Sequence, residues 1–440
     1  MIGVVADDIT GANDIGIMFA KAGIVTHVYA YDAFDGLQAS GGERPGAVVL
    51  DTNSRLDDPG TAYAKVREAT RRLREAGASM WINKTCSVFR GNIGSEFDAM
   101  LDELGERFAV VVLGFPKNGR TTVDGIHYVR GVPLEQSEFR RDPVHPMTES
   151  RPADILQRQT GRRVAHLNRT AVARGPESLR RDIEGLRVHA DYAILDVTDQ
   201  EALRVIAQAV RDEYIVCGSS ALAEELPGVV AFDKGSAAPL RLGGVAGKGI
   251  LCAAGSLMPQ TAAQLAYVQA RGIPVCELDT RLLLREPDRT AAIRAAARKS
   301  SGLMLAGSHV VLHGSNDEHA VRETQRMGAE LGLTRAEVSR LVSSGLAEAA
   351  ALAMAESGQN RLIAAGGETS AAVCARLGVR GMRVHREIEP GLPSCVSLGG
   401  EPMLMVLKSG SFGGADFIDK AFRHLEEASF SNEGRESGRV

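Results

Sequence analysis

The chain lacks the sequence features that mark several common protein classes. Among its 440 residues there is no C-x-x-C pair, no signal-peptide pattern at the N-terminus and no run of eighteen apolar residues. Six cysteines scattered through so large a chain indicate reduced thiols, not a disulfide framework or a zinc site. We therefore expect a cytoplasmic protein without a membrane-spanning segment.

The chain also lacks an excess of positive charge and the best-known phosphate-binding motifs. It has 51 basic and 55 acidic residues and a net charge of −4, which argues against a nucleic-acid-binding surface. Neither G-x-x-x-x-G-K-[ST] nor G-x-G-x-x-G occurs, and no internal repeat has a fixed period. Any phosphate site must be built from other turns.

What is present is a regular alternation of short apolar runs and helical patterns. Apolar residues make up 44% and charged residues 24%, an ordinary composition for a soluble globular protein whose length favours two domains. Such alternation predicts parallel sheets covered on both faces. In the first half we expect strands at 2–6, 24–31, 46–51, 79–83, 109–114, 163–167, 191–197 and 213–217, and helices at 59–76, 94–106, 152–160, 176–188, 199–210 and 219–226. The polar stretch 116–150 predicts a functional loop or a β-hairpin excursion.

After a Pro-, Gly- and Ala-rich segment the alternation starts again. We expect strands at 249–254, 273–278, 309–313, 361–365, 381–388 and 403–408, and helices at 258–270, 288–299, 318–330, 334–357, 369–377 and 414–426. The predicted fold is α/β, with two three-layer domains, largely parallel sheets and an interdomain cleft. The predicted boundaries are a first domain at 1–230, a linker at 231–248, a second domain at 249–426 and a polar tail at 427–440.

The first predicted strand ends in a carboxylate pair. Asp7 and Asp8 follow Ile2–Ala6 and precede Thr10 and Gly11, after which a helical pattern begins. Polar groups in this position lie at the carboxyl edge of a sheet, where open α/β folds bind ligands. The alternative is an ordinary strand–turn–helix in which an Asp or Thr caps the helix.

Three more predicted strands of the first half are followed by basic and hydroxyl residues. Arg55, Lys84, Arg90 and Arg120 would meet Asp7 and Asp8 at one edge of a parallel sheet and form a pocket for an anionic, hydroxylated small molecule. The alternative is that each is a solvated surface charge. The glycines near Arg90 fit either an anion-binding loop or simple turns. We expect the isolated histidines His127 and His145 to be structural.

Strands of the second half end in glycine and hydroxyl residues directly before helices. These junctions are Gly255-Ser256, His313-Gly314-Ser315, Gly366-Gly367-Glu368-Thr369 and Lys408–Gly414. Backbone N–H groups and the helix dipole at such a start favour a phosphate group. Several junctions of this kind in one domain favour a phosphate-rich ligand.

The sequence resembles the four-carbon acid sugar kinases, a family formerly described as a domain of unknown function. The resemblance spans residues 1 to about 425 and rests on ordered motifs: ADDITGANDIG at 6–16, TNSR at 52–55, K-x-C-S-x-F-R-G-N-I-G at 84–94, F-P-x-x-G-R-T-T at 115–122, R-D-P-x-x-P-M at 141–147, G-S-x-x-x-x-T at 255–261, GGET at 366–369 and KSGSFG at 408–413. It implies an N-terminal sugar-acid domain and a C-terminal nucleotide domain. It also implies ATP-dependent phosphorylation of threonate, erythronate or 3-oxo-tetronate in sugar-acid catabolism.

Carried over by position, the resemblance implies ATP contacts at Ser256, Gly366, Gly367, Glu368, Thr369 and Gly410, and we add Gly413 from the same turn. It implies sugar-acid contacts at Asp8, Arg55 and Lys84 and in the loop formed by Arg90, Gly91, Asn92, Ile93 and Gly94. Many members have Asp-Ser-Thr-x-Arg-Gly where this chain has Cys86–Gly91. This departure leaves the identity of the acid open.

The expected reaction is phosphoryl transfer, which depends on positioning and charge neutralisation. We expect ATP and Mg²⁺ as cofactors, with unidentified metal ligands, and Asp7 or Asp8 as the group that orients or deprotonates the acceptor hydroxyl. We expect the sugar acid and ATP as partners, and neither a nucleic acid nor a membrane. The sequence is compatible with a homodimer.

Two alternatives are a phosphatase and a non-catalytic sugar-acid binding protein. A haloacid-dehalogenase-type phosphatase needs Asp-x-Asp, and Ile9 occupies the third position. A pure binding protein would not need the phosphate-type turns.

Overall fold

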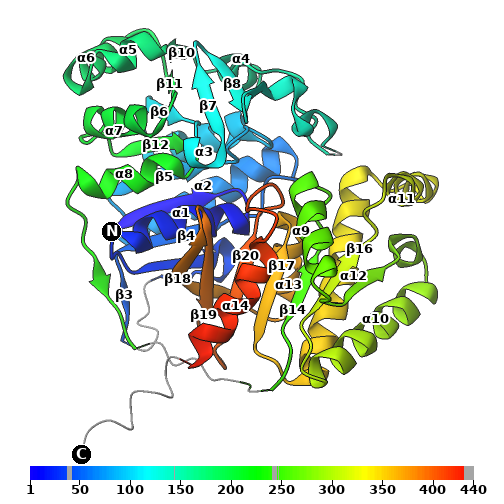
Figure 1. Cartoon of the computed structure of the whole chain (residues 1–440). Coiled ribbons are helices and arrows are strands. Elements are labelled where there is room, and N and C mark those ends of the chain that lie inside the picture. The colour runs from blue at the N-terminus through cyan, green and yellow to red at the C-terminus, as the bar shows by residue number, and fades with distance from the viewer. Residues whose placement is uncertain (37–41, 143, 240–244, 246, 431–440) are drawn as a thin grey trace, which may run out of the picture. The chain divides into compact units, whose positions relative to one another are not determined.

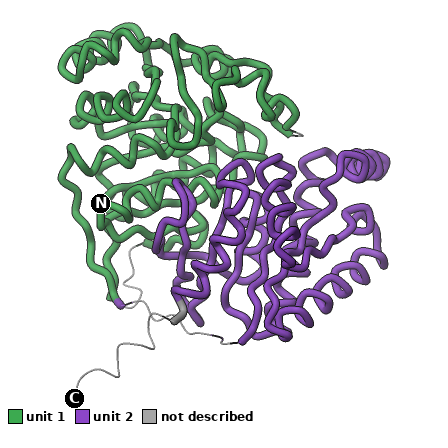
Figure 2. The backbone as a smooth tube through the Cα atoms, in the orientation of Figure 1, with its two compact units in different colours: residues 1–238 green, residues 239–440 purple. Residues whose placement is uncertain are grey.

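A computed structural model describes residues 1–36, 42–142, 144–239, 245 and 247–430. The chain forms two compact units, Met1–Ala238 and Pro239–Val440 (Figure 2). Each unit contains a sheet of mostly parallel strands with helices on both sides, which confirms the predicted α/β class (Figure 1). Residues 240–244 and 246 of the expected linker and 431–440 of the expected tail lie outside the described residues.

The first unit has a parallel sheet whose strands follow the order β10-β11-β6-β12-β5-β1-β4-β2. All residues of β1, β4 and β6 are buried, as expected for parallel strands that are covered on both faces. The strands are β1 (Ile2–Ala6), β2 (Thr26–Ala30), β4 (Ala47–Asp51), β5 (Met80–Lys84), β6 (Ala109–Val112), β10 (Val164–Leu167), β11 (Tyr192–Leu195) and β12 (Ile215–Gly218).

Helices of the first unit pack in two series. In one series α2 contacts α3 and α3 contacts α4, and in the other α1, α8, α7 and α6 contact one another in that order. The helices are α1 (Ile9–Lys21), α2 (Pro59–Glu75), α3 (Ile93–Leu104), α4 (Pro152–Gln157), α5 (Arg169–Ala173), α6 (Pro176–Leu186), α7 (Gln200–Ala209) and α8 (Ala221–Glu225).

Two small antiparallel sheets complete the first unit. The stretch 116–150 contains β7 (Arg120–Val123), β8 (Ile126–Val129) and β9 (Val132–Pro133), which confirms the expected hairpin excursion. The second sheet pairs β3 (Arg44–Pro45) with β13 (Gly235–Ser236), so part of the expected linker is a short strand.

The strand order differs from the sequence order next to the strand ends of interest. The strand β12 lies between β5 and β6, and Gly218 at its end aligns with Lys84 on one side and Val112 on the other. Ser219 and Ser220, which follow β12, therefore lie at the same edge of the sheet as the residues that follow β5 and β6. The sequence had not placed them there.

The second unit has a mixed sheet in the order β18-β19-β20-β17-β14-β16-β15. The pairs β18–β19 and β19–β20 are antiparallel, and the remaining pairs are parallel. The strands are β14 (Leu251–Ala254), β15 (Val275–Leu278), β16 (Val310–Gly314), β17 (Arg361–Ala365), β18 (Gly381–Glu389), β19 (Leu392–Ser397) and β20 (Leu404–Lys408). The strand β19 was not predicted from the sequence.

Helices of the second unit also pack in two groups. One contains α10, α11, α12 and α13, and the other pairs α9 with α14. The helices are α9 (Pro259–Ala270), α10 (Asp288–Leu305), α11 (Glu318–Glu330), α12 (Arg335–Ser357), α13 (Gly367–Arg376) and α14 (Phe417–Phe430). The helix α14 continues past 426, where the polar tail was expected to begin.

One helix of the described residues, α12, is long and apolar enough to cross a membrane by length and composition. Half of its most apolar window is buried inside the protein, and it packs against α10, α13, β14 and β16. These contacts make α12 a core helix of the second unit.

Gly218 provides a test of the junction between β12 and its neighbours. It has a φ of 133°, and a Cβ atom there would lie 2.0 Å from the carbonyl oxygen of Val112. We expect Gly218→Ala to lower the free energy of unfolding by at least about 2 kcal/mol in urea denaturation. The control is Gly185→Ala in α6, where the added atom meets nothing within 4 Å and should stabilise the helix by about 0.5–1 kcal/mol. Equal unfolding midpoints for the two variants would contradict the tight junction.

Candidate functional site

Asp8 is the N-terminal cap of α1. Its Oδ1 accepts a hydrogen bond of 2.6 Å from the backbone N–H of Gly11, and its Oδ2 accepts one of 3.0 Å from the Thr10 hydroxyl. The capping alternative that the sequence left open is therefore correct for Asp8. The same carboxylate also belongs to a charged cluster.

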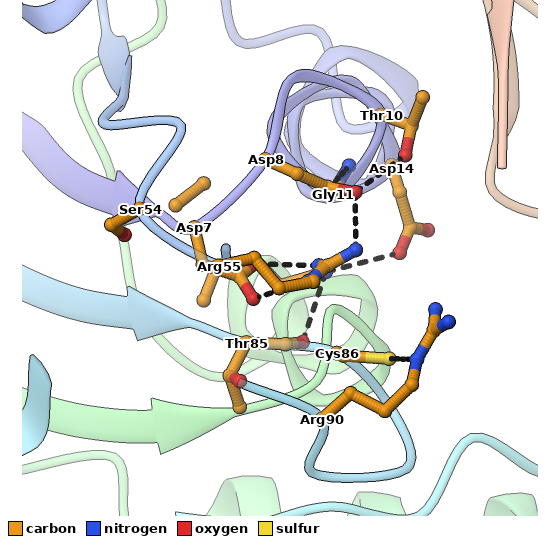
Figure 3. A network of polar contacts seen from close by, with 12 residues as sticks. Asp7, Asp8, Thr10, Gly11, Asp14, Ser54, Arg55, Thr85, Cys86 and Arg90 are labelled. Atoms are coloured by element: carbon orange, nitrogen blue, oxygen red, sulfur yellow. Dashed lines mark hydrogen bonds and ion pairs between the residues drawn. The ribbon is translucent and has the colours of Figure 1, made fainter. Parts of the chain in front are cut away.

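Arg55 joins the loop after β4 to both carboxylates after β1. Its Nε and Nη2 each donate a hydrogen bond of 2.8 Å to Asp7, and its Nη1 donates one of 2.5 Å to Asp8 (Figure 3). Both oxygens of each aspartate are thus engaged, and the two-point contact with Asp7 has the geometry in which Arg holds a carboxylate most firmly.

Burial and charge act in opposite directions on these groups. Burial alone would raise the pKa of Asp8, but the nearby charges of Arg55 and Lys84 outweigh it and hold that pKa below its usual value. Burial also opposes the charge of Arg55, but Asp7 and Asp8 raise its pKa well above the usual range. Asp8 and Arg55 therefore stay ionised around neutral pH.

Three further buried carboxyl groups surround this ionised cluster. Burial raises the pKa of Asp51 to about 7 and that of Asp14 to about 6, with the charge of Asp8 as a smaller contribution. Burial likewise raises the pKa of Glu96 well above its usual range, although Glu96 accepts a hydrogen bond of 2.7 Å from Ser54. Asp51 and Asp14 can therefore gain or lose protons near neutral pH.

Lys84, at the end of β5, faces α1. Its Nζ lies 3.5 Å from Oδ2 of Asp14 and donates a hydrogen bond of 3.1 Å to the Thr85 carbonyl. The same Asp14 oxygen accepts a hydrogen bond of 2.7 Å from Ser220, whereas the buried Oδ1 has no hydrogen-bond partner in the described part of the chain. Asp14 and Ser220 were not among the predicted site residues, although Gly218-Ser219-Ser220 is one more strand end with glycine and hydroxyl groups.

Arg90 links Cys86 to the irregular segment that follows β9. Its Nε contacts the Cys86 sulfur at 3.4 Å (Figure 3). Its Nη1 donates a hydrogen bond of 2.7 Å to Asp142. Burial would raise the pKa of the Cys86 thiol, but the charges of Arg90 and Arg55 outweigh it and lower that pKa below its usual value. Arg90 and Arg55 thus flank the same thiol.

The other residues of the Arg90 loop fix the backbone. Asn92 donates hydrogen bonds of 3.1 Å and 2.9 Å to the carbonyls of Ser54 and Asp57. Gly91 has a φ of 105°, and a Cβ atom on Gly94 would lie 2.4 Å from the carbonyl oxygen of Gln159. These residues hold the loop beside the Arg55 loop.

A cavity of about 350 Å³ lies next to the Arg90 loop. Its lining residues come from that loop, from 144–149 and from the region of α4; they include Phe89, Gly91, His145, Met147 and Arg158. Asp142 fixes the backbone at the start of 144–149 by accepting hydrogen bonds from the N–H groups of Val144 and His145. Pro143 lies outside the described residues.

Arg120 and His127 are buried in the hairpin sheet. Arg120 donates a hydrogen bond to the Asn118 carbonyl, and burial lowers its pKa to about 10. His127 contacts the Thr122 hydroxyl at 3.0 Å, and burial lowers its pKa to about 3. The neutral, packed His127 agrees with its expected structural role.

In the second unit, three strand ends meet closely. The strands β20, β17 and β14 are neighbours, so their glycine turns lie side by side (Figure 1). A Cβ atom on Gly410 would lie 2.0 Å from Oγ of Ser256, and one on Gly366 would lie 3.2 Å from Oγ1 of Thr369. The structure thus brings together residues from three distant motifs.

The turn after β20 is held through its carbonyl groups. Gln264 of α9 donates to the carbonyls of Phe412, Gly413 and Gly414, and Thr261 donates a hydrogen bond of 3.0 Å to the carbonyl of Gly410. A Cβ atom on Gly413 would lie 2.9 Å from Phe417, which explains the glycine there.

The start of α13 has the properties of an anion site. Gly366 is its N-terminal cap with a φ of 125°, and α13 begins at Gly367. The first N–H groups of a helix favour a phosphate group. Glu368 lies in the first turn and accepts a hydrogen bond of 2.5 Å from Ser339.

No group of three or more His, Cys, Asp or Glu side chains in the described ranges is arranged to hold a metal ion. Such an arrangement is not required for Mg²⁺ in nucleotide sites, where phosphates and water supply most ligands.

Comparisons with known proteins agree with this division of the chain. Residues 2–226 match the family model described as sugar-binding N-terminal domain, and residues 251–418 match that described as nucleotide-binding C-terminal domain. A Methylobacterium radiotolerans protein named 3-oxo-tetronate kinase is 36% identical over 96% of this chain and 98% of its own length. A Cupriavidus necator protein of the same name is 33% identical over 97% of both chains.

Crystal structures of two proteins have the same fold at 27% sequence identity. One, from Salmonella typhimurium LT2 and described as a tRNA synthase, has a TM-score of 0.76, and one from Haemophilus influenzae has a TM-score of 0.67. In each case the match covers 96% of this chain and 99% of the other. With both domain models matched in order and relatives above 30% identity over nearly the whole length, the chain belongs to the four-carbon acid sugar kinase family.

Proposed function

We propose that the protein transfers the γ-phosphoryl group of ATP to a hydroxyl of 3-oxo-tetronate in the cytoplasm. The observation that carries this proposal is similarity over the full length to several curated relatives, each named 3-oxo-tetronate kinase. The tRNA synthase description of the Salmonella typhimurium structure is not adopted, because a curated Salmonella typhimurium relative with 30% identity is also named 3-oxo-tetronate kinase.

In this proposal the first unit binds the sugar acid. Arg55, Lys84 and Arg90 are the cations that hold its carboxylate, and the loop from Arg90 to Gly94 forms one wall of the site. Their support is that Lys84 is buried, that the side chains of Arg55 and Arg90 are only 15% exposed, and that each of the three cations lies beside a carboxylate. Gly91 of the loop lines the cavity. Arg is suited to two-point recognition of a carboxylate.

The second unit binds the nucleotide. Ser256, the residues Gly366, Gly367, Glu368 and Thr369, and the turn with Gly410 and Gly413 surround the phosphates of ATP. Support comes from their convergence at three neighbouring strand ends and from the start of α13. Mg²⁺ would accompany the phosphates and neutralise charge that develops during transfer.

Asp7 is the stronger candidate of the two aspartates for the proton acceptor. Asp8 caps α1 and is fixed by Gly11 and Thr10. The hydrogen bonds that the Asp7 carboxylate accepts from described residues, by contrast, all come from Arg55. If the acid's carboxylate takes Arg55, the oxygens of Asp7 become free for the acceptor hydroxyl. The oxygen of the acceptor hydroxyl then forms a bond to the γ-phosphorus, and the bond between that phosphorus and ADP breaks. The proton of the hydroxyl passes to Asp7.

The substrate assignment predicts which acid drives ATP consumption. In a coupled assay of ADP release with Mg²⁺, we expect turnover with 3-oxo-tetronate to exceed that with D-threonate, L-threonate or D-erythronate. The control omits the acid and should show only slow hydrolysis. Preferred use of a threonate or erythronate would overturn the substrate choice, and no ADP release with any of these acids would overturn the kinase proposal.

The role of Asp7 predicts a change in turnover. We expect Asp7→Asn to lower kcat by about 10²–10⁴, the range for loss of a general base. The matched control is Asp58→Asn at the exposed N-terminal cap of α2, where Asn can also cap the helix and activity should persist. Near-normal kcat for Asp7→Asn would show that Asp7 does not accept the proton.

The convergence of turns in the second unit predicts a specific loss of nucleotide affinity. Gly410→Ala places an atom 2.0 Å from Oγ of Ser256, so the turn must move. We expect the KM for ATP to rise by about tenfold or more, equal to about 1.4 kcal/mol, with little change in the KM for the acid. The control is Gly302→Ala in α10, where the added atom meets nothing within 4 Å. An unchanged KM for ATP in Gly410→Ala would contradict the assigned site.

A further inference from the structure

Lys408 is a buried cation directly before the turn proposed to hold the nucleotide phosphates. It is the last residue of β20 and has no solvent exposure. Its Nζ donates hydrogen bonds to the hydroxyl of Thr261 at 3.1 Å and to the carbonyls of Ser409 at 2.9 Å and Gly410 at 3.1 Å. All three partners are neutral oxygens.

The charge of Lys408 has no direct partner in the described residues, because no carboxylate there lies within ion-pair distance of Nζ. Its interacting acid Glu389, on β18, instead forms an ion pair with Lys420 and accepts a hydrogen bond from the Gly414 N–H. The other titratable neighbour is Cys252 on β14, and burial raises its pKa to about 12, so the thiol is neutral. Burying an unpaired ammonium group is costly unless a further interaction compensates for it.

The geometry of the turn indicates what that interaction is. In a planar trans peptide the C=O group of one residue and the N–H group of the next point in opposite directions. Because the carbonyls of Ser409 and Gly410 point at Nζ, the N–H groups of Gly410 and Ser411 point away from it. Lys408 therefore orients two backbone donors of the turn toward the opposite side.

We propose that Lys408 is the positioning residue of the nucleotide site: its ammonium group fixes the turn through two carbonyls and supplies positive charge behind the N–H groups that receive the phosphates. This inference rests on the proposed nucleotide site in the second unit. It adds a residue that acts through the turn without touching the ligand.

The proposal has a measurable consequence for protons. Burial lowers the pKa of Lys408 to about 7 in the free protein, so a part of the molecules carry a neutral amine near neutral pH. Nearby phosphates favour the charged form and raise that pKa. Nucleotide binding should therefore take up a proton, and affinity should be highest below pH 7 and fall as the pH rises through and above 7.

The first test uses the unmodified protein. Titration calorimetry with Mg²⁺ and ADP at pH 7.5, in buffers of different ionisation enthalpy, gives the number of protons taken up on binding. We expect uptake of a fraction of a proton. No uptake would overturn the inference, while absence of any nucleotide binding would overturn the proposed function itself.

The second test uses Lys408→Met, which keeps an unbranched side chain one atom shorter than that of Lys and removes its charge. We expect ADP affinity to fall by about tenfold or more, and we expect the proton uptake on binding to disappear. Any protonation change of the nucleotide itself is the same in both proteins, so it cancels in the comparison with the unmodified protein. The control Lys299→Met removes an exposed charge on α10 and should bind as the unmodified protein does. Circular dichroism checks the fold, and unchanged affinity with unchanged uptake in Lys408→Met would contradict the role of Lys408.

Discussion

Parallel strand pairing is the constraint on which both candidate sites depend. When neighbouring strands run in one direction, their carboxyl ends lie on one edge of the sheet, and the residues that follow them meet there. In the first unit this edge gathers Asp7, Arg55 and Lys84 from β1, β4 and β5. In the second unit it gathers Ser256, Gly366 and Gly410 from β14, β17 and β20. One topological rule thus produces a charged site in one unit and a glycine-rich site in the other.

The cost of burying charged groups is compensated in different ways in the two sites. In the first unit Arg55 pairs with both Asp7 and Asp8, while burial raises the pKa values of Asp51 and Glu96 and so favours their neutral forms. Removing one member of a buried ion pair leaves an uncompensated charge and costs about 3–5 kcal/mol. An anionic substrate can replace the aspartates as the partner of Arg55 without leaving that charge alone. In the second unit the backbone itself supplies the polar groups, and the buried cation Lys408 lies behind them.

Much of this arrangement could be predicted from the sequence because it is encoded locally. Short, fully apolar runs followed by Asp, Arg, Gly or Ser identify both the strands and their functional ends, as at Ile2–Asp8 and Arg361–Thr369. The order of strands in space is not local, so the position of β12 between β5 and β6 could not be foreseen, and neither could the contact of Ser220 with Asp14. Lys408 was visible as part of a motif, but its burial and its contacts depend on how α9 packs. Nor does the sequence show that Asp8 is both a helix cap and an ion-pair partner.

We propose that this four-carbon acid sugar kinase transfers phosphate from ATP to a hydroxyl of 3-oxo-tetronate. Phosphorus-31 magnetic resonance of a reaction containing the protein, Mg·ATP and the acid tests it most directly, because the product itself is observed. We expect a new phosphate-monoester resonance that grows in equal amount to ADP and whose coupling to carbon-bound protons identifies the hydroxyl. Formation of inorganic phosphate alone, or an ATP spectrum that does not change, would contradict it.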